Sequence, residues 1–142
     1  MNTDILTRYA MSFTGIKYKW GGKTPMSGFD CSGLVSEVLK AARVLGPHDN
    51  LSAQQIYDKL SPNGNFGVQK AGSLAFYGKS SKEIDHVVFL IDSDTAMSAS
   101  GGDETVILEE DAISKQAFTK MRNVNYRGDL IAIMRPRYFW EL

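Results

Sequence analysis

The only cysteine of the chain, Cys31, lies in the segment GFDCSGL (28–34). An apolar run at helical spacing follows it, and Asp30 is a good N-cap, so we predict that Cys31 lies in the first turn of a helix. Unpaired main-chain N–H groups at a helix start carry about half a positive charge, which favours the thiolate and lowers the thiol pKa. The alternative is a buried packing role, the usual one for a free cysteine. The position therefore indicates either a nucleophile or a core residue.

A thiolate nucleophile needs a proton acceptor, and the chain contains two histidines, His48 and His86. His48 lies in the polar turn GPHDN, where a solvated loop residue is expected. His86 lies in the run DHVVFLID (85–92), where its side chain shares one face of a predicted strand with apolar residues. Such a histidine is usually a core residue bonded to a carbonyl. A Cys31–His86 pair, however, explains both unusual residues together.

A catalytic imidazole is usually oriented by a third group through its second ring nitrogen. Across a predicted hairpin at 92–94, Ser98 is placed where such a partner would project. One cysteine and two distant histidines supply no zinc-ligand spacing, so we predict neither a metal ion nor another cofactor. The glycines of WGGK (20–23) lack the strand–glycine–helix spacing of a phosphate-binding loop.

Three helices are predicted in the first half of the chain. The first begins near residues 2–4 and ends at Gly15, and a glycine-rich loop follows it. The second, which has the strongest pattern, runs from Cys31 to Leu45. The third begins at Ser52, which has capping-box spacing to Gln55. The face that the first helix is expected to bury consists of Ile5, Leu6, Tyr9 and Phe13.

Runs of β-branched and aromatic residues predict strands in the second half. Their ranges are 73–77, 85–92, 95–99, 105–110 and 129–139, while 111–121 is compatible with a short helix or an irregular excursion. Helices followed by an antiparallel sheet predict an α+β fold. No internal repeat or linker-like tract is present, so we expect one domain.

The 142 residues include 16 basic and 16 acidic side chains and so carry no formal net charge. This balance argues against a nucleic-acid or anionic-membrane partner. Asp4 and Arg8 interrupt an N-terminus that is unlike a secretory signal, and no run approaches the roughly 20 apolar residues of a membrane span. We expect synthesis in a cytoplasm. The pattern does not indicate an oligomeric state, and a monomer is compatible with it.

Four blocks occur in the order and approximate spacing of the NlpC-type cell-wall cysteine peptidases: YKWGGKTPMSGFDCSGLVSEVLKAARVLG, LSAQQ, AGSLAFYG and DHVVFLIDSDTAMSASG. The sequence resembles this family from about residue 5 to residue 137. The resemblance implies a circularly permuted papain-like α+β fold, with the nucleophile at a helix start packed on an antiparallel sheet, and residues 1–142 as a single catalytic domain. It also implies hydrolysis of peptidoglycan stem peptides, at the D-γ-glutamyl–diamino acid bond, through a thioacyl-enzyme.

The resemblance implies roles for individual residues as well. Cys31 matches the nucleophile and His86 the general base. Tyr18 matches the tyrosine whose phenol stabilises the oxyanion together with the N–H of Cys31. Asp30 and Ser32 match positions that, in some members, contact the substrate peptide near its amino end, although an N-cap role is the more secure expectation for Asp30.

Three positions depart from the family pattern. The third catalytic position is usually histidine, asparagine or glutamine, and here the match falls on Ser98, with a carbonyl, a water molecule or another side chain such as Asp103 as the alternative. Val88 replaces a usual glycine and Ser73 a usual acid, which we interpret as local packing changes. Trp20 is expected to be a core aromatic beneath the loop.

Three functions are therefore considered. The leading one is a cysteine endopeptidase acting on the cell wall, expected as a phage or prophage lytic enzyme (an endolysin) released through a holin. A tail-associated phage enzyme, an injected effector and a domain cut from a larger secreted protein are alternatives. The second is an N-acetylmuramoyl-alanine amidase or acyltransferase with the same Cys–His site. The third is a catalytically weak peptidoglycan-binding module, which Ser98 favours and the set of Tyr18, Cys31 and His86 opposes.

Overall fold

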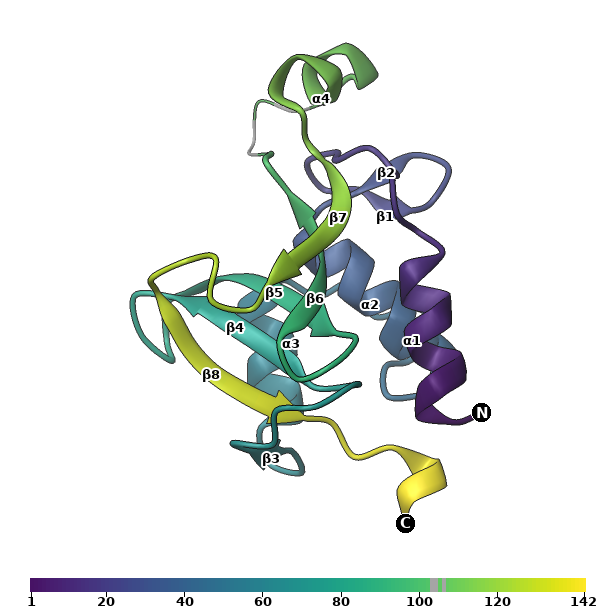
Figure 1. The fold of residues 1–142 in the computed structure, drawn as a ribbon, viewed down its shortest axis with the longest axis vertical. Coiled ribbons are helices and arrows are strands. Elements are labelled where there is room, and N and C mark those ends of the chain that lie inside the picture. Colours follow the sequence, from purple (N-terminus) through teal and green to yellow (C-terminus); the bar gives the residue numbers. More distant parts are fainter. Residues whose placement is uncertain (103–104, 106) are drawn as a thin grey trace.

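The computed structural model describes residues 1–102, 105 and 107–142. Its helices are α1 (Thr3–Met11), α2 (Cys31–Ala41), α3 (Ala53–Leu60) and α4 (Glu109–Lys115), with a 3-10 turn at Phe139–Glu141. A small hairpin of β1 (Lys23–Thr24) and β2 (Gly28–Phe29) lies in the loop between α1 and α2. Figure 1 shows α4 at the end of the molecule, beyond the strands that lead to it. No helix in the described part of the chain is long and apolar enough to cross a membrane.

The main sheet has six strands in the order β3-β8-β4-β5-β6-β7, and neighbouring strands pair antiparallel. These strands are β3 (Asn65–Phe66), β4 (Leu74–Gly78), β5 (Ile84–Leu90), β6 (Thr95–Ser100), β7 (Phe118–Asn123) and β8 (Leu130–Arg135). The helices precede most of the sheet in the chain. The α+β class expected from the sequence is confirmed.

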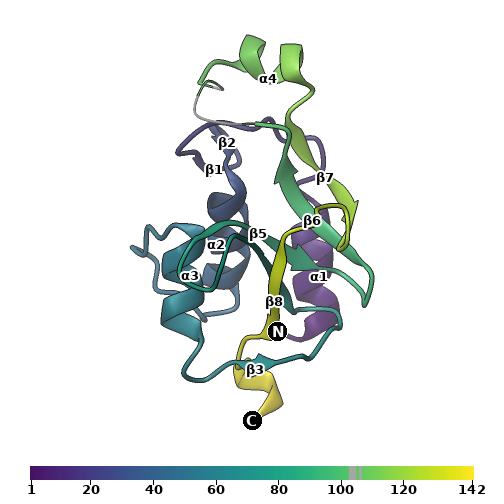
Figure 2. The same ribbon diagram turned by 90° about the vertical axis from the view of Figure 1, so that its left-hand side faces the viewer.

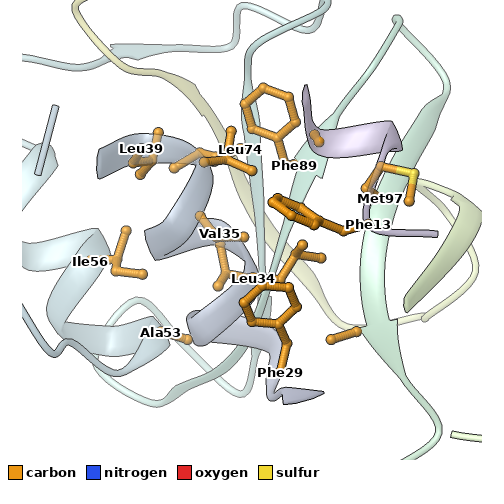
Figure 3. Close-up of a cluster of buried hydrophobic side chains, with 14 of the residues drawn as sticks. Phe13, Phe29, Leu34, Val35, Leu39, Ala53, Ile56, Leu74, Phe89 and Met97 are labelled. Carbon is orange, nitrogen blue, oxygen red and sulfur yellow. The ribbon is translucent and has the colours of Figure 1, made fainter. Parts of the chain in front are cut away.

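The helices α1, α2 and α3 lie on one face of the sheet, as the two views in Figures 1 and 2 show. Alternation along β4 directs Leu74 and Phe76 into the core shared with the helices, where Leu34 of α2 packs (Figure 3). The intervening Ala75 and Tyr77 belong to a second, smaller core on the opposite face. Both faces of the central strands are therefore buried, which holds β4 and β5 rigidly beneath α2.

The helix boundaries largely follow the predicted caps. Asn2 caps α1, and the predicted capping box of Ser52 and Gln55 is present at the start of α3. The second helix ends at Ala41 rather than Leu45, because Arg43 adopts a left-handed conformation (φ 60°) and turns the chain out of the helix.

Two further expectations were wrong. Ile5 is 50% exposed, because α1 turns Leu6 and Ala10 inward instead. The strand predicted at 105–110 does not form among its described residues. Instead α4 begins at Glu109, where the Asp111 carboxylate accepts the N–H of Leu108 at 3.0 Å and acidic residues occupy the first turn. The ambiguous segment 111–121 contains most of α4 and the first four residues of β7.

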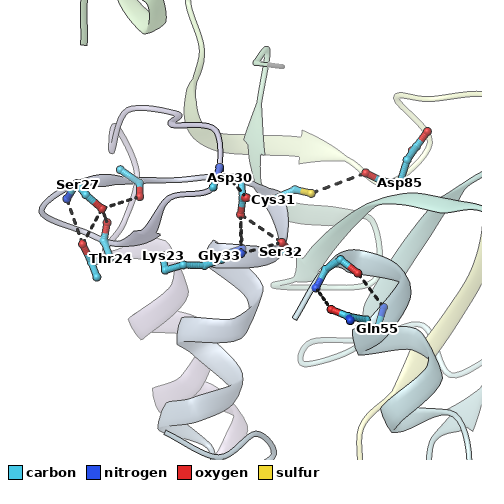
Figure 4. A network of polar contacts seen from close by, with 12 residues as sticks. Lys23, Thr24, Ser27, Asp30, Cys31, Ser32, Gly33, Gln55 and Asp85 are labelled. Carbon is cyan, nitrogen blue, oxygen red and sulfur yellow. Dashed lines mark hydrogen bonds and ion pairs between the residues drawn. The ribbon is translucent and has the colours of Figure 1, made fainter. Parts of the chain in front are cut away.

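The carboxylate of Asp30 joins the start of α2 to the glycine-rich loop before it (Figure 4). Its Oδ1 accepts the N–H of Gly33 at 2.7 Å, and its Oδ2 accepts the N–H of Gly21 at 3.1 Å. A Cβ at Gly33 would lie 2.0 Å from the carbonyl oxygen of Gly22, so the loop main chain occupies the space of a side chain there. This packing places Cys31 at a fixed point on the surface of the loop–helix junction.

We expect Asp30→Ala to lower the free energy of unfolding by about 1–2 kcal/mol, because two N–H groups lose their acceptor. Asp30→Asn retains a cap oxygen and should lose less. Urea denaturation followed by circular dichroism measures both variants. Asp94→Ala, in an exposed turn, is the matched control and should stay within about 0.5 kcal/mol of the parent. Equal losses in Asp30→Ala and Asp94→Ala would contradict the role given to Asp30.

Candidate active site

A cavity of about 820 Å³ opens where the start of α2 meets the start of β5. The glycine-rich loop and first turn of α2 form one wall, and the start of β5 and the ends of β6 and β7, with the β7–β8 connection, form the other. Residues 50–53 and Gln55, before and at the start of α3, also line the cavity. The predicted residues that line it are Tyr18, Asp30, Cys31, Ser32 and His86. The predicted Ser98 lies behind His86, in the wall.

Cys31 is half-buried at the first position of α2, and its side chain is directed at β5 (Figure 4). The thiol donates to the main-chain carbonyl of Asp85, with Sγ 4.0 Å from the oxygen, one residue before His86. Burial raises the thiol pKa to about 11, although the N–H of Val87 acts in the opposite direction. The expectation of a lowered pKa was therefore wrong, because desolvation of the sulfur outweighs the field of the helix start.

His86 is 8% exposed and packs against the rings of Tyr77 and Tyr126. Burial lowers its pKa to about 3, and the nearby guanidinium of Arg127 acts in the same direction. The resting imidazole is therefore neutral. His48, by contrast, is an exposed loop residue, as predicted.

Two hydroxyl groups contact the Nε2 atom of His86. The Oγ of Ser98 lies 3.3 Å away and the Oη of Tyr126 lies 2.6 Å away. Ser98 is fully buried and also hydrogen-bonds the hydroxyl of Ser100 on the same strand. The alternative partner named from the sequence, Asp103, lies outside the described residues. Because both contacts use Nε2, Nδ1 is the nitrogen left for proton exchange with a nucleophile.

Tyr126 was missed by the sequence analysis. It follows β7 in the segment NVNYRGD, where neither periodicity nor a motif distinguishes it. It approaches His86 because the β7–β8 connection folds back over the start of β5, and this contact between residues 40 positions apart has no local signal.

Tyr18 and Trp20 come from the glycine-rich loop but differ in environment. Tyr18 is buried, its N–H donates to the carbonyl of Ala117, and its ring lies over Gly102. A Cβ at Gly102 would come within 2.1 Å of the Tyr18 ring, so only glycine fits there. Trp20 is 52% exposed at the cavity. The expectation that Trp20 is a core aromatic was wrong, because the loop turns its side chain outward into the cavity.

Asp30 and Ser32, the predicted substrate contacts, already bond each other. The Oγ of Ser32 donates to Asp30 Oδ1 at 3.2 Å, and the Lys23 ammonium lies 3.3 Å from the same Oγ. The Asp30 carboxylate also accepts the N–H groups of Gly21 and Gly33, so its role in the structure is to hold the loop and the helix start together.

Positive charge gathers on the opposite wall of the cavity. Arg127 pairs with Asp85 at 3.0 Å and with Asp129 at 2.6 Å. The guanidinium of Arg122 lies over the Tyr126 ring, 4.9 Å from its centroid. The Nε atom of Arg122 is buried and has no hydrogen-bond partner among the residues that the structure describes. Within that same part of the chain, no three His, Cys, Asp or Glu side chains gather as a metal site would require.

Two curated proteins of Bacillus subtilis (strain 168) are similar in sequence. The bifunctional muramidase/DL-endopeptidase CwlT is 33% identical over 86 residues, 59% of this chain and 25% of that protein. The gamma-DL-glutamyl hydrolase is 32% identical over 108 residues, 72% of this chain and 25% of that protein. The chain thus aligns with about a quarter of each relative's length.

Solved structures share the fold. An NLP/P60 family protein from Staphylococcus aureus Mu50, described as similar to lipoprotein, superposes with a TM-score of 0.69 at 21% identity, covering 96% of this chain and 41% of that one. RipD from Mycobacterium tuberculosis, described as a non-catalytic NlpC/p60 domain protein adapted to peptidoglycan binding, superposes with a TM-score of 0.65 at 17% identity, covering 95% and 98%. These likenesses confirm the expected papain-like α+β fold.

The profile of the NlpC/P60 family matches residues 15–127, from the glycine-rich loop through the β7–β8 connection. This range contains Cys31, His86 and the other residues that line or support the cavity. The chain belongs to the NlpC/P60 family.

Proposed function

We propose that residues 1–142 act as a single catalytic domain, a cysteine endopeptidase that hydrolyses peptidoglycan stem peptides at the D-γ-glutamyl–diamino acid bond. One observation carries the proposal: Cys31 and His86 line a single cavity, and the thiol reaches the main chain next to His86. Membership of the NlpC/P60 family and the DL-endopeptidase and gamma-DL-glutamyl hydrolase activities in the names of two relatives support the choice of bond.

The proposed reaction starts from a neutral thiol and a neutral imidazole. His86 takes the thiol proton through Nδ1 as Sγ attacks the scissile carbonyl carbon, and then gives that proton to the leaving amine as the C–N bond breaks. A water molecule, deprotonated by His86, next hydrolyses the thioester and restores the thiol. The hydroxyl of Tyr18 and the N–H of Cys31 are the proposed oxyanion donors. Catalytic hydrogen bonds of this kind often tighten only when substrate binds, which suits the thiol's resting contact with Asp85.

The charges of the cavity fit an acidic peptide. A D-γ-glutamyl residue carries a free α-carboxylate on the same residue as the scissile carbonyl, and Arg122 lines the cavity. An arginine is well suited to a carboxylate because its donors form a planar fork. We propose that Arg122 binds this carboxylate.

A non-catalytic peptidoglycan-binding module is the second proposed function. The similarity to RipD and the serine at position 98, where the family usually has histidine, asparagine or glutamine, favour it. An amidase or acyltransferase would use the same Cys–His pair on another bond. The biological setting proposed for the hydrolase is a phage or prophage lytic enzyme, which acts on the cell wall.

Digestion of purified peptidoglycan tests the proposed function directly. The protein should release new amino groups on diaminopimelate or lysine, identified by mass spectrometry, and Cys31→Ala should release none because the nucleophile is gone. New termini between muramic acid and alanine would instead indicate an amidase. Binding without any Cys31-dependent product, across walls of different chemistry, would overturn the hydrolase in favour of the binding module.

The raised thiol pKa predicts slow alkylation of Cys31 at neutral pH. Because the thiolate is the reactive form, the iodoacetamide rate should rise towards a midpoint near pH 11 in the native protein. Mass spectrometry of samples quenched between about pH 6 and pH 11 follows the rate, which should still be rising at the upper limit, and the same chain in urea, with a midpoint near 8.5, is the control. A native midpoint at or below the unfolded one would contradict the assigned burial effect.

Arg122→Gln should selectively impair cleavage of stem peptides that contain D-glutamate. For these, kcat/KM should fall about tenfold, while for D-isoglutamine peptides, which lack the α-carboxylate, it should change much less. The ratio of the two values is the readout, since any disturbance of His86 affects both substrates alike. Arg137→Gln, an exposed arginine outside the cavity, is the control. An unchanged ratio in Arg122→Gln would exclude the proposed contact.

A further inference from the structure

The imidazole of His86 has two hydroxyl neighbours from different parts of the chain. Ser98 approaches from β6, the strand that follows His86 in the hairpin, and Tyr126 approaches from the β7–β8 connection. The Tyr126 oxygen is 2.6 Å from Nε2, whereas the Ser98 oxygen is at 3.3 Å, beyond the usual range of a strong hydrogen bond.

The serine hydroxyl is also shared. Ser98 hydrogen-bonds Ser100, two positions further along the same strand face, and both residues are buried. Nε2 carries at most one proton, so it makes its stronger hydrogen bond to the nearer oxygen, that of Tyr126.

The connection that carries Tyr126 is tied down on both sides of it. On one side, the carbonyl of Val124 accepts the hydroxyl of Tyr77 at 2.7 Å, and the N–H of Val124 donates to Asp94. On the other side, Arg127 joins the connection to Asp85, the residue before His86. The ring of Tyr126 is thereby held at the start of β5, where His86 lies.

The ring of Tyr126 also has a cation on its face. The guanidinium of Arg122 lies 4.9 Å from the ring centroid, a distance at which the cation and the ring attract each other. Tyr77 packs edge-on against the same ring, with 5.8 Å between the centroids. The phenol is thus restrained in orientation as well as in position, which a group that orients a catalytic imidazole requires.

We propose that Tyr126, rather than Ser98, is the principal positioning residue of His86: its oxygen accepts the Nε2–H proton and so selects the tautomer whose Nδ1 is free. Nδ1 can then accept the thiol proton of Cys31. This assignment rests on the proposed function for its catalytic meaning. A phenol hydroxyl orients the ring through a hydrogen bond, without the negative charge that a carboxylate partner would supply.

Nitrogen-15 NMR of the histidine side chains tests the tautomer without any substrate. At neutral pH the full chain should show His86 with a proton on Nε2 and a bare Nδ1, with His48 assigned through a His48→Gln variant. Tyr126→Phe should abolish this preference and yield a mixture of tautomers, whereas Ser98→Ala should retain it. A proton on Nδ1 in the parent protein would overturn the proposal, whether or not any variant folds.

Turnover supplies the second readout. In Tyr126→Phe, kcat on stem peptides should fall about 10- to 100-fold with KM within about twofold, since a hydrogen bond to the imidazolium formed during the reaction is lost. Ser98→Ala should lose less than about threefold. Tyr57→Phe, which removes the hydroxyl of a half-buried tyrosine that does not line the cavity, should match the parent. A larger loss in Ser98→Ala than in Tyr126→Phe would assign the role to the serine.

The two readouts separate failure of this inference from failure of the proposed function. If the protein does not cleave peptidoglycan but the tautomer shifts in Tyr126→Phe, the contact is established and the hydrolase is wrong. If cleavage occurs and neither tautomer nor turnover responds to Tyr126→Phe, the hydrolase stands and Tyr126 has no positioning role.

Discussion

The capping of α2 by Asp30 is the interaction on which the candidate active site depends. One carboxylate binds the helix start through Gly33 and the preceding loop through Gly21, so both are held by the same side chain. The loop carries Tyr18 and Trp20, and the helix carries Cys31. The main chain of Gly22 packs directly against Gly33, so the loop and the helix are in close contact. The proposed nucleophile, Cys31, and the proposed oxyanion donor, Tyr18, are therefore parts of one rigid unit, set against β5 by the core beneath α2.

Burial, more than the helix start, sets the protonation of this site. The helix field and the N–H of Val87 favour a thiolate, yet desolvation raises the thiol pKa. Desolvation lowers the pKa of the His86 imidazole, because its charged form is the protonated one, and the positive charge of Arg127 lowers that pKa further. Both groups rest neutral, so charge is created only during attack. Under this arrangement the proposed oxyanion donors and the groups around His86 act on charges that form in the reaction rather than on a standing ion pair.

Two hydroxyl groups from different elements reach the imidazole of His86 in the wall behind it. With serine at position 98, the short side chain leaves Nε2 only partly satisfied at 3.3 Å. Tyr126 reaches the same nitrogen from the β7–β8 connection. The guanidinium of Arg122 lies over the Tyr126 ring, and Arg127 of the connection pairs with Asp85 at the start of β5. The positive charge of these arginines disfavours imidazolium but suits an anionic peptide. Arg122 is thus proposed both to bind the substrate and, through the Tyr126 ring, to help to position His86.

The local sequence was sufficient for the features that depend on neighbours in the chain. Asp30 before an apolar periodic run determined a capped helix with Cys31 at its start, the pair Ser52 and Gln55 determined another helix start, and strand alternation placed His86 on one face of β5. Only the tertiary structure decided the rest. The pKa values of Cys31 and His86 depend on how much water the assembled fold excludes, and Trp20 faces the cavity because of the path of its loop. Tyr126 meets His86 because the β7–β8 connection folds back over β5. Burial and contacts between distant segments arise from packing, and the residue types near a position in the chain do not encode them.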